Sequence, residues 1–281
     1  MPRPAKPFVL GAVAYDAKVV TIWDGFRAFF ERAGFPFDYV LYSNYEAQVE
    51  AHLRGELDVA WNSPLAWLET ERAARQQGKQ AHAIAMRDTD RDLTSVILVA
   101  VDDPAQTLAD LRDRSIGVGA SDSPQATLIP LEAIAATGLH PGEDLRVVRH
   151  DVLVGKHGDH IGGERDALRA LVRGTVDAAA IIDVNHLAFQ REGTIPLGSM
   201  RILAQTGTYD HCNMTVLGAP PDAPRFAELL FAMSYDDPQV RPLLDLEGLH
   251  QWLPGRTEGY ALLAQAIDRF GTIADWLATQ A

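Results

Sequence analysis

Hydrophobic and polar residues follow two different periods along this chain, and their alternation predicts an α/β protein. An apolar stripe with a 3.6-residue period predicts a helix over 18–33, ended by Gly34. The stretch 95–101 is continuously apolar, which is typical of a strand buried on both faces. Similar patterns predict further strands at 7–15, 37–42, 58–61, 81–86, 115–118, 145–150, 176–182, 201–205 and 213–217. They predict further helices at 45–53, 64–76, 106–112, 124–137, 164–172, from 185, and at 223–234, 237–243 and 257–277. This order indicates largely parallel sheets flanked by helices.

A short internal similarity predicts two related lobes. The segment LRGELDVA at 53–60 resembles VRGTVDAA at 172–179. Each predicts a helix closed by a glycine, then a tight turn into a buried strand. We therefore expect one lobe from 1–100 with 202–281 and another from 101–201, joined by crossover strands near 95–101 and 201–206.

Composition and charge exclude several partners. Lys and Arg number 25 and Asp and Glu 38, which gives a net charge of −13. This balance argues against nucleic acid or an anionic membrane as the main partner. The single cysteine permits no intrachain disulfide, and no apolar run approaches the ~20 residues of a membrane span. The apolar run at 8–15 is short for a signal peptide and is better interpreted as the first strand. We therefore expect a cytoplasmic protein, or a periplasmic one if a leader has been removed.

Several blocks of sequence resemble the phosphonate-binding branch of the type II periplasmic solute-binding proteins. These blocks are NYEA at 44–47, HLRGELDVAW at 52–61, NSPLAW at 62–67, SVILVAV at 95–101, SPQATLIP at 123–130 and GGERDALRALVRGTVDAAAIID at 162–183. The resemblance implies two α/β lobes with a small ligand held in the cleft between them. It implies a binding protein that closes on a small polar solute by hinge motion, without a cofactor, and an ABC permease as partner if the chain is exported.

The sequence departs from that family where an anionic ligand would bind. The family's anion-binding helix start falls on Ser123, Pro124 and Gln125, and Pro124 has no N–H to offer an oxyanion. Ser123 is equally a good helix N-cap. The family's ligand-binding histidine falls on Glu164, and an expected aromatic falls on Leu93. We therefore expect a solute other than a phosphonate.

Candidate ligand contacts follow the strand ends, where open α/β sheets bind ligands. They are Tyr15, Asn62, Ser63, Ser121, Ser123, Gln125, Asp183 and His186, together with Tyr45, which the resemblance places in the cleft. Each has a structural alternative, because Tyr45 could pack within its helix and Ser63 or Asp183 could cap one.

A glycine-rich loop at 155–164 adds His157, His160 and Glu164 as ligand contacts. Their His-x-x-His-x-x-x-Glu spacing is also compatible with a zinc or iron site. A solvated loop whose histidines contact nothing is the remaining interpretation.

An enzyme on the same scaffold is the alternative function, for example a decarboxylase, a desulfinase, a lyase or a cofactor-biosynthetic enzyme. Its catalytic residues would be Cys212, His211 and Glu164, with Cys212 as nucleophile. Neighbours in an extended segment point to opposite faces, so His211 and Cys212 are not expected to pair with each other. We expect them to converge in one cleft with 157–164, Asp183 and His186. A buried, inert Cys212 is the simpler interpretation, and no known catalytic motif occurs in the chain.

Overall fold

The chain forms two compact units in a computed structural model that describes residues 6–150 and 160–270. Within these residues the first unit comprises 6–91 and 210–260, and the second comprises 92–150, 160–209 and 261–270. The chain passes between the units three times. No helix within the described ranges is long and apolar enough to cross a bilayer.

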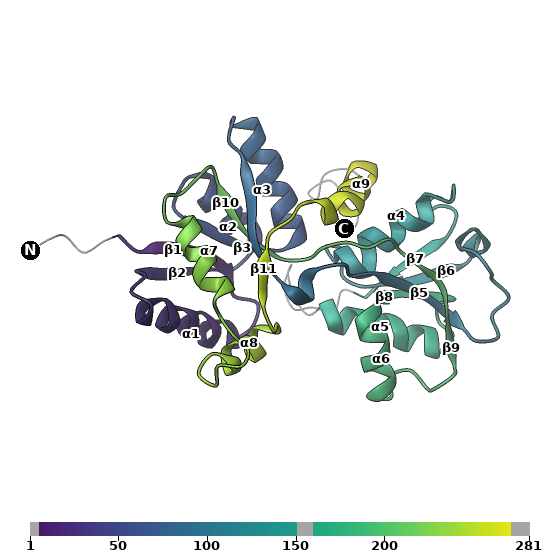
Figure 1. Ribbon diagram of the computed structural model, residues 1–281. Coiled ribbons are helices and arrows are strands. Elements are labelled where there is room, and N and C mark those ends of the chain that lie inside the picture. The colour runs from purple at the N-terminus through teal and green to yellow at the C-terminus, as the bar shows by residue number, and fades with distance from the viewer. Residues whose placement is uncertain (1–5, 151–159, 271–281) are drawn as a thin grey trace, which may run out of the picture. The chain divides into compact units, whose positions relative to one another are not determined.

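A six-stranded sheet in the order β11-β4-β10-β3-β1-β2 forms the centre of the first unit (Figure 1). Its strands are β1 (Phe8–Val13), β2 (Phe37–Tyr42), β3 (Val59–Asn62), β4 (Ala81–Arg87), β10 (Asn213–Leu217) and β11 (Trp252–Pro254). β1 pairs in parallel with β2 and β3, whereas β10 runs antiparallel to β3 and β4. The carboxyl ends of β1, β3 and β4 therefore lie at the same edge as the amino end of β10.

Helices cover both faces of this sheet. They are α1 (Lys18–Arg32), α2 (Tyr45–Leu53), α3 (Pro64–Gln76), α7 (Ala223–Phe231) and α8 (Arg241–Glu247), with 3₁₀ turns η1 (Asp88–Asp90) and η4 (Glu258–Tyr260). Phe8 and Leu10 of β1 belong to one buried cluster with side chains of α1, α7 and α8. Gly11, which follows Leu10 and points the other way, faces Gln48 of α2 on the opposite face. The period-two alternation of β1 thus fills two separate cores.

A five-stranded sheet in the order β7-β6-β8-β5-β9 forms the centre of the second unit. Its strands are β5 (Ser95–Ala100), β6 (Ser115–Val118), β7 (Arg146–Arg149), β8 (Ala178–Ile182) and β9 (Met200–Gln205). β6 is parallel to β7 and β8, and β5 is antiparallel to β8 and β9. The carboxyl ends of β6, β7 and β8 therefore lie at the same edge as the amino end of β5.

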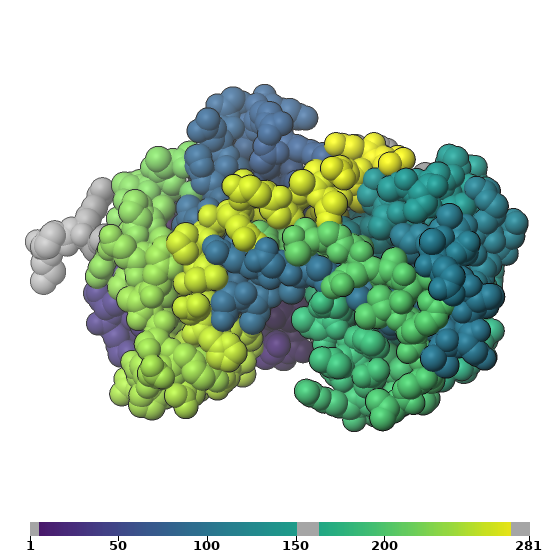
Figure 2. Space-filling model, turned by 45° about the vertical axis from the view of Figure 1, so that its right-hand side comes forward, coloured from purple at the N-terminus to yellow at the C-terminus, as the bar shows by residue number. Residues whose placement is uncertain are grey.

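The helices of the second unit include one from the end of the chain. They are α4 (Ile129–Ala135), α5 (His160–Val172), α6 (Asp183–Arg191) and α9 (Ala261–Phe270), with the 3₁₀ turn η2 (Leu108–Leu111) and the π-helical turn η3 (Pro124–Leu128). Arg269 of α9 bonds Glu132 of α4 at 3.1 Å. Figure 2 shows the yellow atoms of α9 against the teal surface of this unit.

The two copies of the internal similarity occupy equivalent places in the two sheets. Gly55 and Gly174 end α2 and α5 in the left-handed region, with φ of 77° and 69°. In the turns that follow, the carboxylate of Asp58 accepts the N–H of Val9 at 2.8 Å, and that of Asp177 accepts the N–H of Ser115 at 2.8 Å. Each aspartate therefore fastens the start of its own strand to the neighbouring strand.

The structure differs from the expected organisation in three respects. β5 and β9 both belong to the second sheet, and α9 packs on α4, so the division falls at 91/92, 209/210 and 260/261 instead of near 100 and 202. The sheets are mixed instead of largely parallel, because β5, β9, β10 and β11 run antiparallel to their neighbours. β11 was not predicted, since three residues give too short a pattern to recognise.

Candidate functional site

Two tyrosines and several buried charges gather at the edge of the first sheet where β1, β3 and β4 end. Tyr15 follows β1, and Tyr45 begins α2. Although 49% of Tyr15 is exposed, partial burial of the Tyr15 hydroxyl, reinforced by Glu247, raises the pKa of Tyr15 to about 12. Burial and then Cys212 raise the pKa of Tyr45. The charge of Arg87 also acts on both hydroxyls, and it lowers their pKa values. We therefore place Tyr15, Tyr45, Arg87, Cys212 and Glu247 in one neighbourhood, which we call the first edge.

Arg87, the last residue of β4, is held between two buried carboxylates at this edge. Its Nε lies 2.6 Å from Asp90 Oδ2 and its Nη2 lies 2.9 Å from Asp90 Oδ1. Its Nη1 donates to the backbone oxygen of Glu247 at 2.7 Å and lies 3.4 Å from Glu247 Oε1. The guanidinium also stacks over Trp61, 5.2 Å from the ring centre. The guanidinium of Arg87 is therefore bonded to other groups of the protein.

Burial raises the pKa of Glu247 to about 7, against the opposing attraction of Arg87. The geometry is consistent with this direction, since the guanidinium makes its two short bonds to Asp90 and only a longer one to Glu247. The first edge therefore contains one carboxyl group that gains or loses a proton near neutral pH.

His211 and Cys212 contact each other, which corrects the expectation that they would point apart. His211 Nδ1 lies 3.1 Å from Cys212 Sγ and 3.6 Å from Asp90 Oδ1. The two residues precede β10, and the His211 N–H is bonded to the Asp90 carbonyl at 2.8 Å. Alternation of side chains applies within a strand, and these residues lie outside one. Asp90 is the partner that sequence reasoning missed.

This trio does not have the arrangement of a catalytic triad. In a catalytic triad, one ring nitrogen of the histidine bonds the nucleophile and the other ring nitrogen bonds the carboxylate. Here the single nitrogen Nδ1 faces both partners. Burial, followed by the charge of Asp90, raises the pKa of the Cys212 thiol, although Arg87 opposes the shift. The thiol is therefore not activated as a nucleophile. Instead the three ligand atoms lie within 4.8 Å of one another, as donors around a shared centre do.

Asn62 and Ser63, expected as ligand contacts, have structural partners. Ser63 Oγ accepts the N–H of Ala66 at 3.3 Å and so caps α3. Asn62 is fully buried and donates to Thr215 Oγ1 at 2.9 Å. Ser63 therefore has the capping role that was its structural alternative, whereas Asn62 is bonded within the buried interior.

Asn62 belongs to a buried chain of hydrogen bonds that ends at His211. Thr215 Oγ1 donates to Asn213 Oδ1 at 2.6 Å, and Asn213 Nδ2 donates to the Tyr260 hydroxyl at 2.8 Å. That hydroxyl donates to the His211 carbonyl at 2.7 Å. This series of hydrogen bonds fixes the backbone of His211 from the buried side of the sheet.

The corresponding edge of the second unit lies where β6, β7 and β8 end, and we call it the second edge. Ser123 Oγ accepts the N–H of Ala126 at 3.2 Å, so its oxygen caps η3. The backbone oxygen of Gln125 accepts Ser95 Oγ–H at 2.5 Å, and Ser95 Oγ lies 2.8 Å from the Tyr209 hydroxyl. Gln125 Oε1 is buried with no hydrogen-bond partner among the described residues. Ser121 is half-buried in the loop after β6.

Carboxylates dominate the end of β8 at this second edge. Glu164 is fully buried, and its Oε2 accepts the Ile182 N–H at 3.1 Å and the Asn185 amide at 2.9 Å. Asp183 Oδ2 accepts the Thr94 hydroxyl at 2.7 Å. Burial raises the pKa of Tyr209, and Glu164 and Asp183 add to the shift. Glu164, Asp183 and Tyr209 therefore lie together.

His186 is half-buried on α6, and burial lowers its pKa, against Asp183. His157 and the side chain of His160 fall outside the described part of the structure, so the metal set His157, His160 and Glu164 stays a prediction. Glu164, Asp183 and His186 belong to the second unit, whereas His211 and Cys212 belong to the first. The expected convergence of all five in one cleft also stays a prediction.

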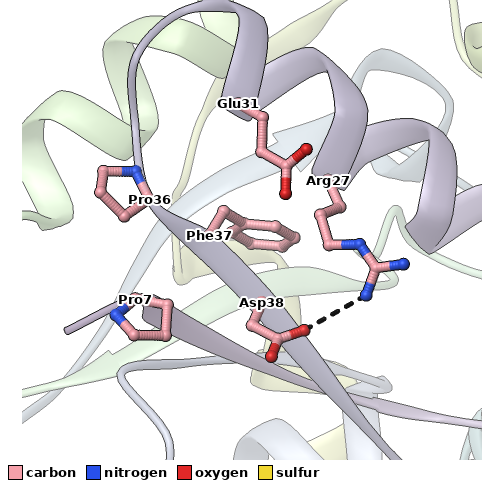
Figure 3. A pocket seen from close by; sticks show the side chains of 6 residues that line it. All are labelled: Pro7, Arg27, Glu31, Pro36, Phe37 and Asp38. Atoms are coloured by element: carbon pink, nitrogen blue, oxygen red, sulfur yellow. Dashed lines mark hydrogen bonds and ion pairs between the residues drawn. The ribbon is translucent and has the colours of Figure 1, made fainter. Parts of the chain in front are cut away.

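A surface hollow of about 500 Å³ lies at the end of the first sheet opposite the first edge (Figure 3). Pro7, Pro36 and Phe37 line it where β1 and β2 begin, at the opposite end of these strands from Tyr15. Arg27 and Asp38, 3.5 Å apart, form an ion pair across it. This hollow contains none of the expected site residues.

Comparison with known proteins identifies one family and one fold. Residues 11–260 match the family model described as the periplasmic substrate-binding protein of the phosphonate ABC transporter. The fold is similar to PhnD1 from Prochlorococcus marinus (MIT 9301) in complex with methylphosphonate, at 15% identity, TM-score 0.65, and coverage of 94% of this chain and 99% of that one. XAC2383 from Xanthomonas citri bound to ATP gives 16% identity, TM-score 0.67 and 98% coverage of both chains.

The periplasmic aliphatic sulphonate-binding protein SsuA from Escherichia coli is also similar, at 17% identity and TM-score 0.52, with coverage of 94% of this chain and 84% of that one. A comparison with curated protein sequences found no match. The structural likenesses confirm the expected fold class, an α/β protein with two sheets flanked by helices as in the type II periplasmic binding proteins.

These matches decide between the two functions considered from the sequence. They support a solute-binding component of an ABC transporter and give no support to an enzyme on this scaffold. They also give no support to the expected cytoplasmic location, because the family's description is periplasmic. Binding proteins of this kind generally need no cofactor. The family model matches well over half of the sequence, so the chain belongs to the family of periplasmic substrate-binding proteins of phosphonate ABC transporters.

Proposed function

We propose that this chain binds a small polar solute that carries amino or hydroxyl hydrogen-bond donors, and that it binds methylphosphonate only weakly. The observation that carries the proposal is the fully buried carboxylate of Glu164 at the end of β8. The family resemblance puts a ligand-binding histidine at this position. A carboxylate accepts hydrogen bonds and attracts cations, whereas it repels an anion.

The surroundings of Glu164 strengthen the preference. Asp183 lies at the same strand end, and Ser123 Oγ is already used to cap η3. Two charges of the same sign about 5 Å apart repel each other by about 3 kcal/mol at an effective dielectric constant of 20. A phosphonate placed beside Glu164 would meet this repulsion, whereas an ammonium group would gain a similar attraction.

We also propose that the connectors between the units serve as hinges. Hydrogen bonds fasten the connectors close to the points of division. Leu93 and Tyr209 exchange backbone bonds of 2.8 Å within the second unit, and the His211 N–H bonds the Asp90 carbonyl within the first. On the connector at 91/92, only Arg91 and Asp92 lie between the bonded residues Asp90 and Leu93. Asp92 has a left-handed φ of 55°. Bending would therefore concentrate at these few residues.

The proposed location is the periplasm and the proposed partner is an ABC permease, as for the family. The net charge of −13 and the absence of membrane-spanning helices among the described residues are compatible with this placement. Fractionation of cells that express the full-length protein from its own gene would test it.

Titration calorimetry with methylphosphonate tests the proposed ligand chemistry. The wild-type chain is expected to bind it with a dissociation constant above about 0.1 mM. Glu164→Gln keeps an oxygen for the Ile182 N–H but removes the charge, and it is expected to bind at least tenfold more tightly. Glu192→Gln, which removes an exposed carboxylate paired with Arg165, is the matched control and should change nothing. Sub-micromolar binding by the wild type would overturn the proposal.

A further inference from the structure

We propose that Asp90, His211 and Cys212 form a binding site for a thiophilic divalent metal ion such as Zn²⁺, with one coordination position left open. The three residues belong to the first unit and come from two segments far apart in the sequence. Their ligand atoms lie within 4.8 Å of one another. The proposal does not depend on which solute the protein carries.

Two of the three distances between the ligand atoms are close to those of a tetrahedral ligand set, and the third is no longer than 4.8 Å. Zinc binds sulfur at about 2.3 Å and nitrogen or oxygen at about 2.0–2.2 Å, so neighbouring ligand atoms lie roughly 3.3–3.6 Å apart. Here Nδ1 of His211 lies 3.1 Å from Cys212 Sγ and 3.6 Å from Asp90 Oδ1. Small side-chain adjustments would therefore place the three ligand atoms at three corners of a tetrahedron around the ion.

The backbone holds the ligands in place independently of any ion. The His211 N–H bonds the Asp90 carbonyl at 2.8 Å, which ties η1 to the segment before β10. The Tyr260 hydroxyl donates to the His211 carbonyl at 2.7 Å, at the end of the buried hydrogen-bond chain from Asn62. Sites with supporting bonds of this kind lose less freedom when an ion binds.

The donor types select the class of metal. Thiolate and imidazole favour zinc and other soft or borderline ions, whereas magnesium and calcium prefer an all-oxygen set. The side chain of His211 is 22% exposed, so an ion can reach the site from solvent. Three protein ligands with a fourth position open is the arrangement of zinc sites that bind a further small molecule.

Arg87 is compatible with an ion at this position. It occupies one lone pair on each Asp90 oxygen, and a carboxylate oxygen has a second one to offer.

Cobalt substitution tests the site directly, because Cys212 is the only cysteine in the chain. Any thiolate-to-cobalt charge-transfer absorption must come from this residue. We expect one equivalent of Co²⁺ to give that absorption together with the visible bands of tetrahedral cobalt, and Zn²⁺ to remove both. Cys212→Ser should abolish the charge-transfer absorption, and His211→Gln should weaken Zn²⁺ binding at least tenfold.

The matched control is His250→Gln. His250 forms an exposed pair with Asp88, 3.6 Å apart, which resembles the His211–Asp90 pair but has no thiol. This variant should leave the cobalt spectrum and zinc affinity unchanged. Absence of charge-transfer absorption in the folded wild type, or equal zinc affinity in the wild type and Cys212→Ser, would overturn the proposal. Circular dichroism verifies that each variant is folded.

Discussion

Replacing Glu247 by Gln should flatten the dependence of stability on pH. In the wild type, burial raises the pKa of Glu247 from 4.5 to about 7, although Arg87 opposes the shift. The folded chain therefore holds this proton between pH 4.5 and 7, where the unfolded chain has released it. A raised pKa contributes stability that is fully present below pH 4.5 and is lost as the pH rises through 7.

The expected magnitude follows from the two pKa values. For values of 4.5 and about 7, the contribution of this one group falls by about 2–3 kcal/mol between pH 5 and pH 8. Gln has a similar shape and no charge, and Arg87 keeps its two short bonds to Asp90. The variant should therefore resemble the wild type at pH 5 and be the more stable protein at pH 8.

Urea unfolding at pH 5 and pH 8, followed by tryptophan fluorescence, measures this difference. Four of the five tryptophans belong to the first unit with Glu247: Trp23, Trp61, Trp67 and Trp252. Other titrating groups cancel when the two proteins are compared. Glu228→Gln, at an exposed pair with Arg225, is the control and should keep the wild-type pH dependence. The same change in unfolding free energy from pH 5 to pH 8 in Glu247→Gln as in the wild type would refute the reasoning.

Two further predictions concern stability. Asp58→Ala and Asp177→Ala each remove the acceptor for a neighbouring strand's N–H, and each should lower the free energy of unfolding by about 1–2 kcal/mol, measured by urea denaturation. If the two variants did not lose similar amounts of unfolding free energy, the two turns would not be equivalent. Gly255→Ala would place a methyl group into the carbonyl of Ala83 on β4, and it should cost about 3 kcal/mol or more. Unchanged thermal unfolding of this variant would show that β11 can shift without loss.

Local periodicity and turn chemistry were sufficient to predict most of the fold. Helix 18–33 and strand 95–101 lie within a residue of the observed α1 and β5. The repeated Arg-Gly turn at 54–55 and 173–174 correctly indicated two related sheets, because its glycine must adopt a positive φ. The unit boundaries were harder to place, since which strands pair with β8 depends on contacts between distant segments.

The candidate site depends on pairings that no local pattern reveals. Asp90, Arg87 and Glu247 meet across 160 residues of sequence, and a carboxylate in a polar loop is normally exposed. His211 and Cys212 were candidates from the sequence. Their contact could not be predicted, because it depends on the Asp90 carbonyl holding His211 outside a regular strand.

The residues that carry the chemistry of the first edge also fasten the chain where it leaves the first unit. Asp90 lies just before the first passage between the units, His211 just after the second, and Tyr260 just before the third. Hydrogen bonds join His211 to both of the others. A ligand that moves Asp90 or His211 must therefore act on the proposed hinge segments as well, since their backbones share these bonds. The proposed binding chemistry and the proposed hinges would thus depend on the same few contacts.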